Sequence, residues 1–158
     1  AFAASCAAER TVYGFASEEG PMEIRLVPSR HYASVASDLY LRLTTTQRSY
    51  WFGFSVSNGY SGITLLPVSD PTRADAEPDG PQDLLDRLGE DGASDGLLAN
   101  LRFYALDDDL SFWANPPVAG EPAPTYLMVP ELGHLALILA LPLVLGLAAA
   151  HAQVIQLK

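Results

Sequence analysis

The sequence predicts a mainly β protein: a small antiparallel β sandwich or barrel-like sheet with one or two short helices, followed by one C-terminal transmembrane helix. Three observations lead to this prediction. Several short stretches alternate apolar and polar residues with a period of two, as half-buried strands do. One aromatic-rich stretch runs into an Asn-Gly turn, which is typical of a tight hairpin. Residues 132–157 contain no Asp, Glu, Lys or Arg over 26 positions.

The first third of the chain is expected to enter the sheet after a flexible lead-in at residues 1–10. Thr11–Phe15 predicts a short strand because it is rich in aromatic and β-branched residues. Met22–Val27 alternates with period two, and Pro28 ends that strand. Leu39–Thr44 continues the β pattern and places its three leucines on one face.

Residues 48–68 predict a β-hairpin. Tyr50–Val56 and Gly62–Leu66 are the two strands, and Asn58-Gly59 readily supplies the positive φ angles of a type I′ turn. Alternation then divides the first strand between two faces. One face carries Tyr50, Phe52, Phe54 and Val56, and the other carries Trp51 and Ser55.

The segment after the hairpin changes character. Residues 69–82 hold three prolines and four acids, a composition that indicates a surface loop. Asp83–Leu88 suits a short helix with its leucines on one side. Leu97–Leu106 is ambiguous, and its pattern is compatible with a helical turn that runs into a strand. An acidic β-rich domain is therefore expected over residues 11–113.

The end of this domain is predicted from three short segments. Asp107, Asp108 and Asp109 indicate a turn. Leu110–Trp113 predicts a short strand. Residues 114–131 hold five prolines and predict an extended stalk that leads towards a membrane.

Charge divides the chain unevenly. The net charge is -10, but eight arginines and nineteen acids all precede residue 132, so this part carries -11 and Lys158 is the one charge after it. An acidic domain of this kind excludes nucleic acid as a partner, because phosphate binding requires clustered Lys and Arg. It also disfavours lying flat on an anionic membrane surface.

The segment 132–157 is long enough to cross a bilayer, since a spanning helix needs about 20 mostly apolar residues. A proline inside the segment predicts a kink that neighbouring helices must compensate. Small residues in its second half allow close helix approach. These features predict a helix that packs against other helices, through Pro142, Gly146, Ala148, Ala149 and Ala150.

The flanks of this segment predict an orientation. Basic residues tend to stay in the cytoplasm, and Lys158 is the one basic residue near either end. Small residues around Ala1 resemble the region of a signal-peptide cleavage site. We therefore expect a bacterial inner-membrane protein with its domain in the periplasm. Cys6 follows Ala3-Ala4-Ser5, a loose lipobox, so it is either a lipidated residue or a free thiol.

Two histidines fall within the predicted span. His134 and His151 are 17 residues apart, which is about 25 Å along a helix. This separation predicts interfacial positions near opposite membrane faces. The alternative is that they are axial ligands to a haem or a chlorophyll-type pigment, because imidazole is a common metal ligand. No other cofactor is indicated.

The remaining candidates for chemistry each have a structural explanation. Three consecutive aspartates at 107–109 suggest calcium, but calcium loops space their ligands at alternate positions, which favours a solvated turn. His31 could act as a catalytic base only with a nearby carboxylate such as Asp38. The aromatic residues of Tyr50–Phe54 could form a binding platform, although alternating aromatics are more often core.

Residues Val129–Leu141 read Val-Pro-Glu-Leu-Gly-His followed by an apolar run. This stretch resembles the opening of the bacterial cytochrome c haem lyase subunit, which enters its first membrane helix through a similar Pro-Glu-x-Gly-His sequence. The further helices and the Trp-rich segment of that family have no counterpart in these 158 residues, so no catalytic residue carries over. The stretch also looks like the sorting tail of exosortase substrates, with Leu132 in place of the second proline.

Together these features predict a non-enzymatic, single-pass accessory subunit of a larger energy-transducing or assembly complex in a membrane. Its partners would be the complex and the lipid bilayer. The alternative is an extracellular surface or adhesion protein, or a lipoprotein, that is anchored or sorted by its C-terminal tail.

Overall fold

The computed structural model of the chain describes residues 6–17, 20–29, 36–56, 62–73, 80–84, 101–131 and 154–156. These residues form one 3-10 helix and eight strands. The helix is η1 (Ala8–Arg10), and the strands are β1 (Val12–Ser17), β2 (Gly20–Pro28), β3 (Leu39–Thr44), β4 (Ser49–Val56), β5 (Ile63–Val68), β6 (Leu101–Leu106), β7 (Tyr126–Met128) and β8 (Val154–Gln156).

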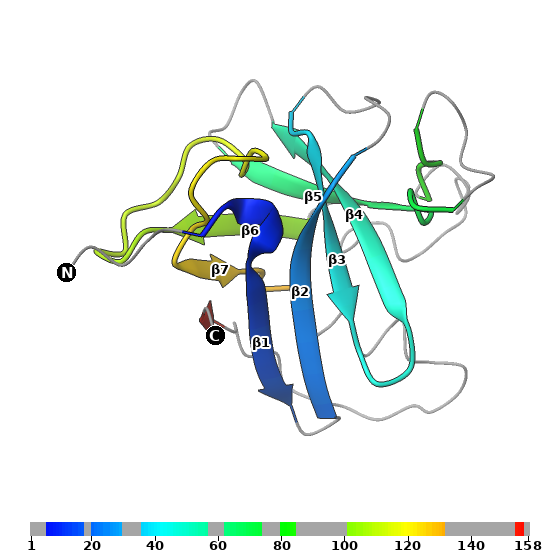
Figure 1. Cartoon of the computed structure of the whole chain (residues 1–158), viewed down its shortest axis with the longest axis horizontal. Coiled ribbons are helices and arrows are strands. Elements are labelled where there is room, and N and C mark those ends of the chain that lie inside the picture. The colour runs from blue at the N-terminus through cyan, green and yellow to red at the C-terminus, as the bar shows by residue number, and fades with distance from the viewer. Residues whose placement is uncertain are drawn as a thin grey trace.

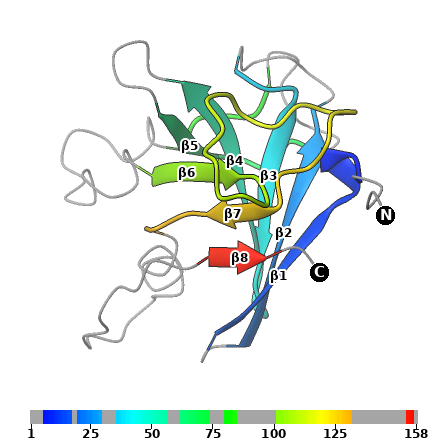
Figure 2. The ribbon, with the colours of Figure 1, turned by 90° about the vertical axis from the view of Figure 1, so that its left-hand side faces the viewer.

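The strands form a meander in which each strand pairs antiparallel with the next one in the chain. The long strands β1 to β4 lie side by side and β6 and β7 turn across them (Figure 1). The sheet curls until β8 lies near β1, as Figure 2 shows. The described part of the chain is therefore a nearly closed antiparallel sheet, which confirms the mainly β prediction and its barrel-like form.

The core fills the inside of this curled sheet with residues from almost every strand. The register explains how they meet, because Leu26 of β2, Leu41 of β3 and Phe52 of β4 are direct cross-strand neighbours. All three are buried. Phe54 of β4 and Phe103 of β6 close the interior edge to face, with ring centroids 5.1 Å apart.

The predicted hairpin at residues 48–68 is confirmed. Its strands are β4 and β5, paired from Trp51–Val68 to Val56–Ile63. The Asn-Gly turn lies outside the described residues. The strands predicted at 11–15, 22–27 and 39–44 are likewise confirmed as β1, β2 and β3.

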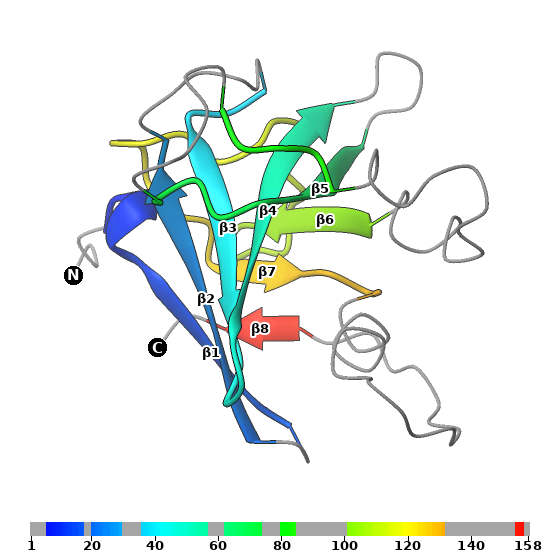
Figure 3. The same ribbon diagram turned by 90° about the vertical axis from the view of Figure 1, so that its right-hand side faces the viewer.

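The outer face of the sheet carries a second, smaller packed layer. Arg25, Arg42, Trp51 and Val68 are successive cross-strand neighbours from β2 to β5. The guanidinium of Arg42 lies 5.6 Å from the centre of the Trp51 ring, and Trp51 is buried. Residues 80–84 run beside the end of β5, where they cover part of this face (Figure 3).

The short helix predicted at 83–88 starts differently in the structure. Asp83 forms an antiparallel bridge with Val68, and the N–H of Leu84 donates to the carbonyl of Pro67 at 3.0 Å. Asp83 therefore continues the sheet beside β5 instead of beginning a helix, and Leu84 lies in a bend. Residues 85–88 lie outside the described part of the chain.

Residues 114–131 pack against the sheet instead of forming an extended stalk. Pro116, Pro117 and Pro124 are buried, and Tyr126–Met128 forms β7. The buried hydroxyl of Tyr13 donates to the carbonyl of Pro124 at 2.7 Å. Tertiary hydrogen bonds of this kind hold the segment on the domain.

The C-terminal segment also differs from the sequence prediction where it is described. Val154–Gln156 is strand β8 and pairs with β7, whereas a helix is predicted over 132–157. Residues 132–153, 157 and 158 lie outside the described part. Within the described residues, no helix is long and apolar enough to span a membrane.

Candidate functional site

A tight hairpin projects from the end of β6. The N–H of Asp107 donates to the carbonyl of Ser111 at 3.1 Å, and the N–H of Leu110 donates to the carbonyl of Asp107 at 3.1 Å. The N–H of Trp113 returns the chain to the sheet by donating to the carbonyl of Ala105 at 2.9 Å. The three aspartates therefore form a turn, as predicted.

The turn is stabilised by one of its own aspartates. Asp109 Oδ1 accepts a hydrogen bond from the N–H of Ser111 at 2.9 Å. The hydroxyl and the N–H of Ser111 together hold the pKa of the exposed Asp109 carboxyl below its ordinary value. Asp109 is consequently ionised at neutral pH.

Leu110 occupies an unusual backbone conformation at this turn. Its φ angle is 66°, and among the described residues it is the one non-glycine with a positive φ. The left-handed region costs an L-residue roughly 1–2 kcal/mol relative to its preferred conformations. The side chain is also 62% exposed, so burial does not offset this cost. Because strain of this kind clusters at functional sites, Leu110 is a candidate functional residue.

Phe112 is the second large apolar residue that the hairpin presents. It is 63% exposed and packs edge to face on Tyr104, with ring centroids 5.6 Å apart. Tyr104 belongs to β6, so this contact holds the Phe112 ring against the sheet while its outer side faces solvent. Leu110 and Phe112 therefore offer an apolar tip on a fixed hairpin.

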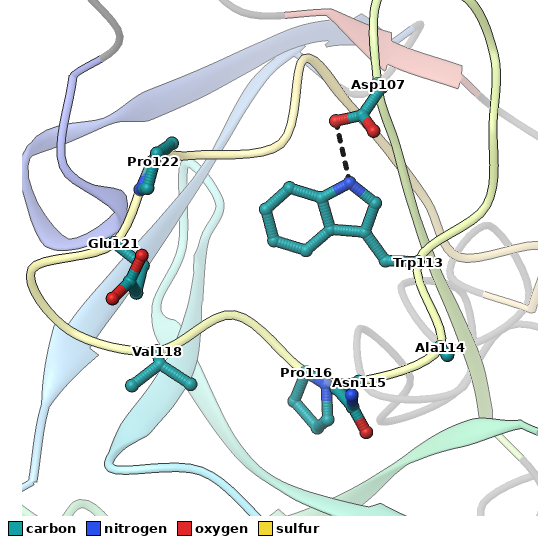
Figure 4. Close-up of a pocket in the computed structure, with 8 residues that line it drawn as sticks. All are labelled: Asp107, Trp113, Ala114, Asn115, Pro116, Val118, Glu121 and Pro122. Atoms are coloured by element: carbon teal, nitrogen blue, oxygen red, sulfur yellow. Dashed lines mark hydrogen bonds between the residues drawn. The ribbon is translucent and has the colours of Figure 1, made fainter.

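An open pocket of about 480 Å³ lies beside the hairpin. Trp113 lines this pocket, and its indole Nε1 donates to Asp107 Oδ1 at 2.7 Å. Figure 4 shows the indole between this carboxylate and the loop that carries Val118, Glu121 and Pro122. The remaining lining residues are Ala114, Asn115 and Pro116.

The wall opposite Trp113 is held by side chains from the start of the chain. Ser37 Oγ donates to the carbonyl of Pro117 at 2.6 Å, and Asp38 Oδ1 accepts from the N–H of Ala119 at 2.9 Å. Glu9 Oε2 accepts from the N–H of Gly120 at 2.9 Å. This last bond lowers the pKa of Glu9.

These contacts make the pocket a preformed feature rather than a gap between loops. Asp38, the carboxylate considered as a partner of His31, has a structural role in this wall. His31 itself lies outside the described residues.

The other residues singled out from the sequence fall into two groups. Cys6 is described, is exposed and is in no disulfide; its carbonyl accepts from the N–H of Ala123 at 2.9 Å. The possible axial ligands and the helix-packing residues lie outside the described part of the chain: His134, His151, Pro142, Gly146, Ala148, Ala149 and Ala150. Within the described residues, no group of three His, Cys, Asp or Glu side chains could hold a metal ion.

The aromatic stretch of β4 is core, as its alternation favoured. Phe52 and Phe54 are buried inside the sheet, and Trp51 is buried on the outer face. The exposed aromatic surface comes instead from Phe112, with the half-buried Trp113 beside it. The sequence signal for it is the apolar stretch Leu110–Trp113 directly after three aspartates.

No family model, curated protein or solved structure matches the chain. The candidate site therefore has to be interpreted from its own geometry.

Proposed function

We propose that the protein is a non-enzymatic docking protein, an accessory subunit that binds a larger membrane complex. The contact would be made by the docking surface, which we define as Leu110, Phe112 and the Trp113 pocket. The observation that carries this proposal is the exposure of Leu110 and Phe112 on a hairpin whose backbone is strained. Neither burial nor backbone preference explains a leucine at this position, whereas binding to a partner would.

The chemistry of the pocket supports recognition of a partner side chain. Trp113, Val118 and Pro122 offer apolar contacts, and Val118 is 42% exposed. One oxygen of Asp107 is already engaged by the indole of Trp113. Large aromatic residues at the edge of a preformed pocket are typical of the residues that dominate interface energies.

The attachment to a membrane is proposed from the sequence of residues 132–157. The absence of charge over this length supports a spanning helix, with the domain outside and Lys158 in the cytoplasm. Pro142 and the small residues that follow support packing against helices of the complex. The docking surface and the helix would then be two contacts with one assembly.

Co-purification from gently solubilised membranes tests the proposal. The wild-type chain should co-purify with a stoichiometric partner, and Leu110→Ser/Phe112→Ser should lose that partner. Val56→Ser is the matched control, because Val56 is an exposed valine at the far end of β4. Photo-crosslinking from position 112 should capture the same partner.

A chain that runs alone in every mild detergent would overturn the proposal. Equal retention of the partner by the double variant would exclude the docking surface. The mass of the mature chain addresses the alternative of a sorted surface protein, since loss of everything after Glu131 would support sorting. An added lipid mass on Cys6 would show a lipoprotein.

A further inference from the structure

We infer that the segment which docks on this surface is basic: an apolar side chain flanked by Lys or Arg on a partner protein. This inference rests on the proposed docking function and specifies the chemistry of the partner. It is carried by the acidic side chains of the hairpin turn and of the pocket lining, since apolar contact alone would suit many partners.

Acids belong both to the hairpin and to the pocket lining. Asp108 and Asp109 are exposed at the tip of the hairpin, directly before Leu110. Asp107 and Glu121 line the pocket beside Trp113. An apolar side chain that enters the pocket therefore lies beside the carboxylates of Asp107 and Glu121. The turn that carries Asp108 and Asp109 begins at Asp107.

These carboxylates have no basic partner within the described part of the chain. The salt bridges there join Arg25 to Glu23 and Arg102 to Glu131. Arg10 follows Glu9, whose carboxylate holds the pocket wall, and its charge acts on Glu9. The negative potential around the pocket is thus available to a bound cation, and complementary charge favours both specificity and association rate.

The charge of the surface also distinguishes this partner from two other occupants. A second copy of the chain would bring the same acids against one another, because a twofold contact pairs identical patches. An anionic lipid surface would repel them. A basic segment is the one occupant whose charge and apolar character both match.

Selection from a random peptide library displayed on phage tests the inference on the full chain. Peptides are enriched on wild-type protein after counter-selection on Leu110→Ser/Phe112→Ser. We expect the enriched sequences to place Lys or Arg beside a large apolar residue. Binding of synthetic copies should be followed by Trp113 fluorescence, with Trp113→Phe as the control for the signal.

Isosteric variants then separate the contribution of charge to peptide binding from the contribution of shape. Asp108→Asn/Asp109→Asn removes two charges and keeps an oxygen that can accept the hydrogen bond of Ser111. This variant should weaken the selected peptides by about three- to tenfold at low salt, and the difference should shrink as salt screens the charges. Leu110→Ser/Phe112→Ser should weaken them by at least about tenfold at any salt.

The outcomes distinguish the two levels of the proposal. Enriched peptides that depend on Leu110 and Phe112 but lack basic residues would overturn the inference and leave the docking function intact. Selection that never depends on the hairpin would overturn the docking function itself. Self-association of the chain in sedimentation, or binding to phosphatidylglycerol vesicles, abolished by the same double variant, would assign the surface to another occupant and overturn the inference.

Discussion

At the scale of single residues, substitutions of Leu110 should affect stability and binding in opposite directions. Leu110→Gly removes the strain of a positive φ, although glycine also increases the entropy of the unfolded chain. The net result should be a gain of about 0.5–1 kcal/mol in the free energy of unfolding. Chemical denaturation measures it, and Leu110→Asn should behave in the same direction, because asparagine tolerates this region.

The same variants should lose binding through the docking surface, because both delete the exposed leucine side chain. If Leu110 were selected for stability alone, both variants would lower the stability and leave binding unchanged. A destabilised Leu110→Gly protein would show that the leucine side chain contributes to folding, and the argument from strain would then fail.

The buried hydroxyl of Tyr13 makes the stability of the protein depend on pH. This hydroxyl donates to the carbonyl of Pro124, and burial raises its pKa above the ordinary value of 10.0. The folded state then holds this proton more tightly than the unfolded state. The contribution of Tyr13 to stability is complete below pH 10 and falls as the pH rises above it.

Tyr13→Phe isolates this contribution. The variant leaves the Pro124 carbonyl without its donor, so it should lose about 1–2 kcal/mol of stability at pH 8. The difference between the variant and wild type should shrink between pH 10 and 12. Urea denaturation at several pH values measures both effects, and a constant difference over this range would contradict the assignment.

At the scale of elements, Gly53 interrupts the outer face of β4 without a need for its conformational freedom. A Cβ at this position would meet Tyr40 Cε1 at 3.7 Å and Val68 Cγ1 at 3.9 Å, both ordinary contacts. Because glycine weakens a strand interior, Gly53→Ala should raise the free energy of unfolding by about 0.5–1 kcal/mol.

Gly20 is the control for this prediction, since it begins β2 with a φ of 114°. A Cβ there would lie 2.9 Å from Thr46 Cγ2. Gly20→Ala should therefore destabilise the protein by at least about 1 kcal/mol. Thermal denaturation of the pair checks both signs, and destabilisation by both variants would refute the role given to Gly53.

Sequence patterns predicted β2, β3 and the β4–β5 hairpin because each alternating stretch reports which side chains turn inward. They did not predict β7, whose three residues follow a proline-rich segment. The position of that segment depends on contacts from far along the chain, such as Ser37 with Pro117 across 80 positions and Glu9 with Gly120 across 111. Local sequence cannot encode such pairings by itself.

The candidate site was likewise predicted from the sequence only in part. Apolar residues after three aspartates marked a turn and a short strand, and the turn is present. The functional signal at Leu110 is a φ angle, which arises only when the hairpin closes on β6. The pocket depends on a wall that Asp38 and Ser37 fix from another part of the chain.

At the scale of the whole molecule, a membrane span and strand β8 exclude each other. A helix over residues 132–153 would be about 33 Å long, enough to cross a hydrocarbon core of about 30 Å. It would carry Val154–Gln156 to the far side of the membrane, whereas pairing with β7 keeps them beside Tyr126–Met128. The membrane-spanning part of the proposed function requires the first arrangement.

Cysteine labelling in intact cells decides between these arrangements. The exposed Cys6 of the wild-type chain should react with a membrane-impermeant maleimide from the periplasmic side. Lys158→Cys in a Cys6→Ala background should react only after the inner membrane is permeabilised, because Lys158 is proposed to lie in the cytoplasm. Reaction of position 158 in intact cells would place the C-terminus with the domain, as β8 has it, and the docking surface would then have to hold the partner without a membrane helix.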